Sequence, residues 1–411
     1  MSRARSRLLA AAVVVAASVS SLAWAQEARG GGPPPIAAPQ AILVEPDTGD
    51  VLFARRPHDR RPVASATKLM TALLVLERTS PGDVFTAATY RPVSSAETRI
   101  GLRPGERMKV RDLLRALLLA SANDAAQTLA QRTAGSTAAF VDLMNRRARE
   151  LRLADTQYSN PIGLDDAANY SSAEDLARLT ARLRRIPFFA RTVALPRARL
   201  SSGRGPRVIE NRNDLIGSHR YVNGVKTGHT LGAGYVLVGS ATRRGVTVVS
   251  AVLGEPGGAA RDADTLALLN YGLSRLRAVR ILSPARPVAQ VAVRHRARDR
   301  VGLVPTRRFG WVMRRGEQAR VEVRAPRLIE GPLPAGTRRG IAIVRVRGRV
   351  VARVPLMTAA PIPGVGLLGR AAEALRKPDT LALAAAAAAA LALAAAIRRR
   401  RAAGAGRAGT A

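Results

Sequence analysis

The segment Ala64-Ser65-Ala66-Thr67-Lys68-Leu69-Met70-Thr71-Ala72 places a serine three residues before a lysine, where an apolar run of helical character begins. A helix that starts here brings Ser65 and Lys68 onto one face, one turn apart. A desolvated ammonium group can lose its proton, whereas a guanidinium group cannot. The pattern therefore predicts a nucleophilic Ser65 whose proton is taken by Lys68. The chain has only four lysines among 66 lysine and arginine residues, and two of them stand in motifs.

The second motif is Ser121-Ala122-Asn123, which follows the helical pattern Val110–Leu118. We expect this segment to be an extended link whose alternate residues point into one cleft. Ser121 would then pass the proton to a leaving amine. Asn123 would hold Lys68 and a peptide amide of the substrate.

The third motif, Lys226-Thr227-Gly228, comes before a strand at Tyr235 and is predicted to lie on an edge strand. Lys226 would supply a positive field, Thr227 would bind a carboxylate, and Gly228 would let the backbone pass close to the substrate. The backbone N–H groups of Ser65 and His229 are the expected oxyanion hole. One such donor contributes about 3 kcal/mol to transition-state stabilisation.

The order S-x-x-K, S-x-N, K-T-G is the signature of penicillin-recognising serine acyl-transferases. Residues 38–277 also resemble the low-molecular-mass penicillin-binding proteins, the D-alanyl-D-alanine carboxypeptidases, in several further stretches. These are Ala41–Glu77, Asn160–Leu164, Tyr170–Leu176, Asn211–Asn213, Lys226–Thr230, Val252–Gly254 and Leu268–Gly272. The resemblance implies peptidoglycan stem peptides as substrate, sensitivity to β-lactam antibiotics and no cofactor. It also implies that Arg212 and Arg261 help to bind the terminal carboxylate of the substrate.

The chain departs from the family pattern at two residues and in its C-terminal tail. Ala122 replaces a common glycine, which is a small change. Ile162 replaces a common histidine, so the sequence leaves the role of its loop open. The family usually ends in an amphipathic helix on the membrane surface, whereas the tail of this chain is apolar on every side.

The predicted fold class is α+β, because strands at both ends of residues 38–277 enclose a run of helices. This pattern fits a β-lactamase/transpeptidase-like catalytic domain, an antiparallel sheet with a helical subdomain. Within it, Ser171-x-x-Glu174 is predicted to be a capping box that opens a helix. Residues 281–357 contain only short β-rich runs and predict a small all-β domain.

The two ends of the chain predict export and membrane attachment. Residues 1–25 have a basic start, an apolar stretch and an Ala-x-Ala site, which together are typical of a signal peptide. Residues 26–37 are expected to be a linker, as are residues 358–380. Residues 381–397 contain only Ala, Leu and Ile and predict a transmembrane helix. The arginines that follow would keep residues 398–411 in the cytoplasm, with the catalytic domain on the outer side.

Composition narrows the chemistry. There is no cysteine, which excludes disulfides and thiolate catalysis, and the four histidines show no metal-ligand spacing. We therefore expect no metal. The formal net charge is +37, but the arginines are spread along the whole chain and are not interleaved with aromatic residues. This favours contact with an anionic membrane or wall over nucleic acid.

Three other functions are compatible with the motifs. A serine β-lactamase shares them, but its commonest class needs a glutamate in an E-x-x-L-N loop, and Glu174 is not followed by that sequence. A D,D-endopeptidase uses the same site on cross-linked peptides. A catalytically inactive wall-binding protein would be expected to lack Ser65, Lys68 or Lys226.

Overall fold

The computed structural model describes residues 32–294, 296–364, 366 and 378–405. The predicted signal peptide and residues 26–31 of the predicted linker lie outside this described part. The chain divides into two compact units, Met1–Ala278 and Val279–Ala411, each of which is described by itself.

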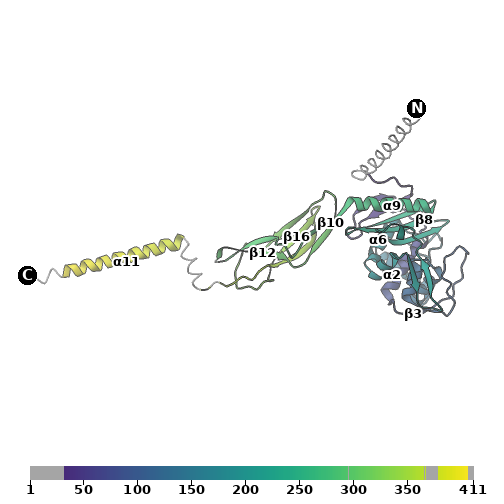
Figure 1. Cartoon of the computed structure of the whole chain (residues 1–411), viewed down its shortest axis with the longest axis horizontal. Coiled ribbons are helices and arrows are strands. Elements are labelled where there is room, and N and C mark those ends of the chain that lie inside the picture. The colour runs from purple at the N-terminus through teal and green to yellow at the C-terminus, as the bar shows by residue number, and fades with distance from the viewer. Residues whose placement is uncertain (1–31, 295, 365, 367–377, 406–411) are drawn as a thin grey trace, which may run out of the picture. The chain divides into compact units, whose positions relative to one another are not determined.

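A five-stranded antiparallel sheet forms the frame of the first unit (Figure 1). Its strand order is β2-β1-β9-β8-β7. The strands are β1 (Gln40–Val44), β2 (Val51–Arg55), β7 (Val222–Thr230), β8 (Gly234–Arg243) and β9 (Val246–Glu255). Strand β1 pairs with β9, so Ile42 lies opposite Ala251 and the two sequence ends of the unit meet in the middle of the sheet. Strands from both ends of the predicted domain therefore form one sheet, which confirms the α+β class.

Helices cover both faces of this sheet because alternate strand residues point to opposite sides. Helix α9 (Gly258–Arg275) packs on one face, where Gly272 lies against Leu43 and Val248. Ile42 and Val249, which are the neighbours of those two residues in sequence, belong to the core shared with the helices on the other face. Figure 1 shows α9 and α2 on opposite sides of the sheet.

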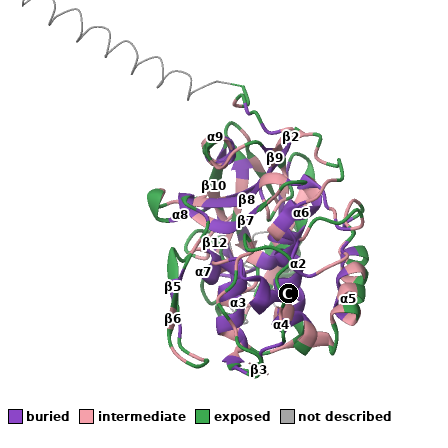
Figure 2. Cartoon of the chain, turned by 90° about the vertical axis from the view of Figure 1, so that its right-hand side faces the viewer, coloured by how far each residue is buried: buried purple, intermediate pink, exposed green. Residues whose placement is uncertain are grey.

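The helical region lies between β2 and β7 in the chain, and α2 (Lys68–Arg78) is its centre. Every residue of α2 from Lys68 to Val75 is buried, whereas α5 exposes a broad face (Figure 2). The other elements are η1 (Ala64–Thr67), α3 (Val110–Leu118), α4 (Asn123–Ala134), α5 (Thr137–Glu150), α6 (Ala173–Arg184), α7 (Pro187–Val193) and α8 (Leu215–Ser218), with the hairpins β3 (Val84–Thr86)–β4 (Arg107–Lys109) and β5 (Arg197–Leu200)–β6 (Arg207–Glu210). A helix that is buried over its first eight residues gives the motif residues at its start a rigid base.

Two local predictions were wrong. The helix predicted to be capped by Ser171 and Glu174 begins one residue later, because the Ser172 side chain accepts a hydrogen bond from the Asp175 backbone nitrogen. The predicted extended link around Ser121 is also shorter than expected. It ends at Ala122, because Asn123 is already the first residue of α4.

The second unit is built on a six-stranded sheet with the order β14-β16-β17-β12-β11-β15. Its strands are β11 (Ala289–Val293), β12 (Arg296–Pro305), β14 (Ala319–Arg324), β15 (Leu328–Ile329), β16 (Arg338–Val346) and β17 (Arg349–Thr358), and a separate pair is formed by β10 (Leu276–Leu282) and β13 (Phe309–Arg314). Ile362 is buried in the core of this unit. The predicted linker from residue 358 therefore starts too early.

A long helix, α11 (Pro378–Ala405), follows. In the part of the chain that the structure describes, one helical stretch is long and apolar enough to cross a membrane, Leu381–Arg399. Its 19 residues correspond to a length of about 28 Å, close to the thickness of a bilayer core.

Candidate active site

Ser65 and Lys68 meet at the start of the buried helix. Residues Ala64–Thr67 form a 3-10 turn, and α2 continues from Lys68. A 3-10 turn places side chains three residues apart almost directly above one another. The Lys68 ammonium nitrogen, Nζ, lies 2.8 Å from the Ser65 hydroxyl oxygen, Oγ. The predicted helix thus begins as a tighter turn, and this turn brings the predicted pair together.

Lys68 is fully buried, and this sets its protonation. Burial lowers the pKa of Lys68 to about 7, although the nearby carboxylate of Glu97 acts in the opposite direction. The neutral amine is therefore populated close to neutral pH. A neutral Lys68 can accept a proton from the hydroxyl that it contacts.

The second anchor of Lys68 is a backbone atom. Its Nζ donates to the carbonyl oxygen of Ile162 at 2.6 Å. The loop that presents this carbonyl is shaped by Asn160, whose side-chain oxygen accepts from three consecutive backbone nitrogens, those of Ile162, Gly163 and Leu164. The sequence left the role of this loop open, and the structure shows that its main chain holds Lys68.

Ser121 and Lys226 form a second hydroxyl–amine pair. Lys226 Nζ donates to Ser121 Oγ at 2.9 Å and to the Thr227 carbonyl at 2.8 Å. Burial and the neighbouring cations Lys68, Arg212 and Arg261 push the pKa of Lys226 well below its ordinary value. The two short motifs, which are 105 residues apart, are therefore joined directly.

Asn123 lies beside this pair but does not hold Lys68 as expected. Its amide nitrogen, Nδ2, donates to a carboxylate oxygen of Glu97 at 2.7 Å. Its backbone nitrogen donates to the Thr98 carbonyl. Among the described hydrogen bonds, those of Lys68 go to Ser65 and Ile162. Sequence reasoning missed Glu97 because it stands in an irregular loop with no motif.

Strand β7 is an edge strand, as predicted, and it passes close to Ser65. A Cβ atom added at Gly228 would lie 3.0 Å from the Ser65 backbone nitrogen and 3.1 Å from the Val63 carbonyl oxygen. Only a glycine leaves the backbones this close. The strand therefore brings the backbone of Gly228 and His229 to the side of Ser65 on which an oxyanion hole was predicted.

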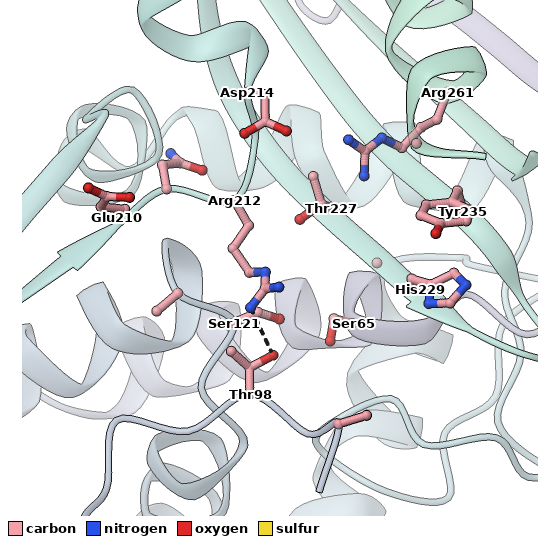
Figure 3. A pocket seen from close by; sticks show the side chains of 15 residues that line it. Ser65, Thr98, Ser121, Glu210, Arg212, Asp214, Thr227, His229, Tyr235 and Arg261 are labelled. Atoms are coloured by element: carbon pink, nitrogen blue, oxygen red, sulfur yellow. Dashed lines mark hydrogen bonds between the residues drawn. The ribbon is translucent and has the colours of Figure 1, made fainter.

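These residues border a polar cleft of about 680 Å³ (Figure 3). Ser65, Ser121 and Thr227 line it, together with Arg212 and Arg261. Arg212 extends toward Ser121 and donates to the Thr98 hydroxyl at 3.4 Å, while Arg261 pairs with Asp262 at 2.8 Å. The cleft can thus offer a nucleophile and two guanidinium groups to an anionic acyl donor. The two lysine amines are buried behind the hydroxyl groups of Ser65 and Ser121 that they contact.

The remaining aromatic and acidic groups define the rim of this cleft. The ring of His229 packs on Tyr235, with 4.1 Å between the ring centroids. The acidic residues among those lining the cleft are Glu210 and Asp214. Glu174, the residue considered as the deacylating glutamate of a β-lactamase, is not among the residues that line the cleft. It contacts His58 and Arg178. In the described residues no cluster of His, Cys, Asp and Glu could hold a metal ion.

A nucleophilic serine with a buried lysine, on an α+β fold with an edge strand beside them, defines a serine acyl-transferase of the penicillin-recognising class. Residues 27–257 match the family model for D-alanyl-D-alanine carboxypeptidase, and the chain belongs to this family, peptidase S11. It is 30% identical over 327 residues to the D-alanyl-D-alanine carboxypeptidase DacF of Bacillus subtilis, which covers 78% of this chain and 84% of the relative.

Solved structures of the same kind are also similar. Penicillin-binding protein 6B from Escherichia coli matches with a TM-score of 0.61 and 29% identity, over 80% of this chain and 97% of that one. The protein PBP3 from Streptococcus pneumoniae, described as a peptidoglycan synthesis regulatory factor, matches with a TM-score of 0.65 and 25% identity, over 80% of this chain and all of that one. The predicted family and fold are thereby confirmed.

Proposed function

We propose that the protein is a serine D-alanyl-D-alanine carboxypeptidase that removes the terminal D-alanine from peptidoglycan pentapeptides. The observation that carries this proposal is the 2.8 Å contact between Ser65 Oγ and Lys68 Nζ, made by a fully buried lysine whose pKa is lowered to about 7. A buried amine beside a serine hydroxyl is the arrangement that nucleophilic catalysis needs. Membership of the family supports the same reaction.

The reaction follows from the roles of these groups. Neutral Lys68 takes the proton of Ser65 as its oxygen attacks the carbonyl carbon of the scissile D-Ala-D-Ala bond. The backbone N–H groups of Ser65 and His229 stabilise the oxyanion. The C–N bond then breaks, and the leaving amine receives a proton by way of Ser121, which contacts Lys226. Water hydrolyses the resulting ester and regenerates Ser65, and no cofactor takes part.

The cationic side of the cleft supplies the preference for a free carboxylate. Thr227, which lines the cleft, would hydrogen-bond the carboxylate of the last D-alanine, and Arg212 and Arg261 would provide positive charge. Gly228 lets the peptide lie along β7. Asn123 would accept from a peptide N–H. The same site would bind β-lactam antibiotics, which also carry a carboxylate beside a reactive carbonyl.

The test of the nucleophile is labelling with a fluorescent penicillin followed by mass spectrometry of the mature protein. We expect a single adduct on the peptide that contains Ser65 and loss of labelling in Ser65→Ala. The exposed Ser95, in the loop beside the cleft, gives a matched control, because Ser95→Ala should be labelled like the wild type. Labelling that persists in Ser65→Ala would reject the assignment.

The test of substrate is a comparison of pentapeptides with a free and an amidated C-terminus. Amidation should lower kcat/KM by roughly 10²-fold or more, since cationic groups in the cleft would lose their partner. Equal rates on the two peptides would favour a D,D-endopeptidase that cuts cross-links.

The apolar stretch of α11 supports a membrane-anchored location. Residues 381–397 would span the cytoplasmic membrane, with the arginines from Arg398 onward in the cytoplasm and the catalytic unit outside. A spanning helix keeps the full-length protein in membranes washed with alkaline carbonate, and truncation before Pro378 should release active enzyme. Recovery of the intact protein in the wash would favour attachment to the surface instead.

A further inference from the structure

The carboxylate of Glu97 accepts the hydrogen bonds that hold one wall of the cleft in place. One of its oxygens accepts from the backbone nitrogens of Val93 at 2.7 Å and Ser94 at 3.2 Å. The other accepts from Asn123 Nδ2 at 2.7 Å and, in a short contact, from the Tyr90 hydroxyl. Burial alone would raise the pKa of Glu97, but these hydrogen bonds hold it below its ordinary value. Glu97 is therefore a saturated, ionised acceptor.

The loop around Glu97 is attached to the start of α4 by its neighbours as well. The Thr98 carbonyl accepts from the Asn123 backbone nitrogen at 2.7 Å. The Asp124 carboxylate accepts from the backbone nitrogens of Ile100 and Leu102. Thr98 also lines the cleft. The wall of the cleft and the motif residue Asn123 are consequently joined by several hydrogen bonds.

An ionised carboxylate can only accept hydrogen bonds, and this fixes how the Asn123 amide is turned. Its NH₂ group must face Glu97, because the amide oxygen would meet another acceptor there. The carbonyl oxygen, Oδ1, is then directed away from Glu97. It is left to accept from a peptide N–H or from Lys68.

Glu97 also carries a charge into a group of cations. Lys226, on β7, is close enough to Lys68 for the two positive charges to repel each other. Arg212, in the loop before α8, and Arg261, on α9, also repel the charge of Lys226. Glu97 is the carboxylate that acts on Lys68. Glu97 itself is hydrogen-bonded by Tyr90 and Asn123. The carboxylate of Asp124 is also near, because its charge acts on the Tyr90 hydroxyl. The negative charge of Glu97 therefore opposes the effect of burial on the catalytic amine.

We propose that Glu97 is a positioning residue of the reaction, which orients the Asn123 amide and stabilises the protonated form of Lys68. This rests on the proposed function, because it assigns Lys68 and Asn123 their parts in acylation. Two separate consequences follow. Loss of the charge should favour neutral Lys68 at lower pH, and loss of the acceptor should free the Asn123 amide to turn.

The experiment measures the second-order rate of acylation by a fluorescent penicillin between pH 5.5 and 9, on the full-length protein. For the wild type we expect the rate to rise with pH around a midpoint of about 7, set by Lys68. In Glu97→Gln the midpoint should fall by on the order of half a pH unit, since a nearby opposite charge is removed. The rate at the plateau should fall roughly tenfold as Asn123 loses its orientation.

Two further variants separate these effects from general loosening of the loop. Glu97→Asp keeps the charge but shortens the reach to Asn123, so it should keep the midpoint and lose plateau rate. Glu106→Gln is the matched control. Glu106 is a buried carboxylate that also fastens this loop, through the Arg103 backbone nitrogen, and it pairs with Arg207. Its loss should leave the midpoint unchanged.

The outcomes decide between the two proposals. A Glu97→Gln midpoint equal to that of the wild type, an equal shift in Glu106→Gln, or a full plateau rate in Glu97→Asp would overturn the role of Glu97 alone. No labelling of the wild-type protein would overturn the proposed function and this inference together. If Glu97→Gln does not fold, as judged by circular dichroism, the Glu97→Asp plateau rate still decides the positioning role.

Discussion

The two units of this protein differ in where they keep their polar groups. In the part of the chain that the structure describes, every buried polar or charged residue but one lies in the first unit, and the exception is Thr358. Burial of a polar group costs free energy unless it is hydrogen-bonded, and burial of a charge costs more. The first unit carries this cost around Ser65, Lys68 and Lys226. This contrast identifies the reactive unit without reference to any motif.

Arginine content shows the same contrast from the other side. Residues 279–364 contain 19 arginines and four acidic residues. None of the described charged side chains of this segment is buried. Its core consists of residues such as Leu303, Val344 and Leu356. A high density of charge therefore marks a solvated surface here, whereas two lysines in the other unit mark chemistry.

The largest expected effect is at Lys68. Lys68→Arg keeps the positive charge but removes the amine that takes the Ser65 proton, so acylation should fall by roughly 10³-fold. Lys226→Arg should be milder if Lys226 acts mainly by its field. Stopped-flow labelling with a fluorescent penicillin measures both. Equal losses in the two variants would show that the division of roles between the lysines is incorrect.

Gly228→Ala should have the next largest effect, a loss of about 10- to 100-fold in acylation rate. The added methyl group would press on the Ser65 backbone nitrogen at 3.0 Å and displace the nucleophile from its attacking position. Gly205→Ala is the control, because nothing lies within 4 Å of a Cβ atom there. A rate for Gly228→Ala equal to that of the control would mean that β7 and Ser65 move apart at little cost.

The next prediction concerns the free energy of unfolding, which Glu255→Gln should change. Burial, together with a hydrogen bond and charge repulsion from Asp264, raises the pKa of Glu255 from 4.5 to about 7. The folded state thus binds a proton that the unfolded state releases, and stability falls as pH rises between these values. Glu255→Gln should remove this loss and stabilise the protein at pH 8 by roughly 1 to 3 kcal/mol.

Urea unfolding of full-length wild type and Glu255→Gln at pH 5 and pH 8 measures this difference. Glu150→Gln on the exposed side of α5 is the control. Because the Glu150 side chain is half exposed, this substitution should have the same small effect on the free energy of unfolding at pH 5 and at pH 8. A Glu255→Gln variant that is less stable than the wild type at pH 8 would contradict the buried, protonated carboxyl.

The smallest effect is expected in the second unit. Arg320 of β14 lies directly opposite Arg345 of β16, and like charges in that position repel. Arg320→Gln should therefore leave acylation unchanged and alter stability by less than about 0.5 kcal/mol, in the stabilising direction. Thermal unfolding and penicillin labelling of the variant test this. A loss of acylation would contradict the separation of roles between the units.

Much of the site could be predicted because most of its reactive residues lie in short sequence motifs. A serine and a lysine three residues apart meet in any helical turn, so Ser65 and Lys68 needed no long-range information. The turn between β8 and β9 is also local: Arg244 and Gly245 both take positive φ, as a tight hairpin turn requires, and a glycine between two apolar runs is the sequence sign of such a turn. Local rules were sufficient in both cases.

What could not be predicted depends on contacts between distant segments. Glu97 is 26 residues from Asn123, and the Ile162 carbonyl is 94 residues from Lys68. Irregular loops have no period that would reveal such partners. The start of α6 was missed by one residue, because two adjacent serines offer equivalent caps. In the second unit, β13 pairs with β10, which is distant in the chain, so no local pattern could reveal this pairing.

The carbonyl of Ile162 has one consequence for how this enzyme can change over evolution. A side-chain acceptor for the catalytic amine could be deleted by a single mutation, but a main-chain acceptor is present whatever residue is encoded. The amine therefore keeps its anchor with isoleucine at position 162, where the family pattern commonly has histidine. Drug-resistance mutations at this position would have to act by moving the loop, because they cannot remove the atom.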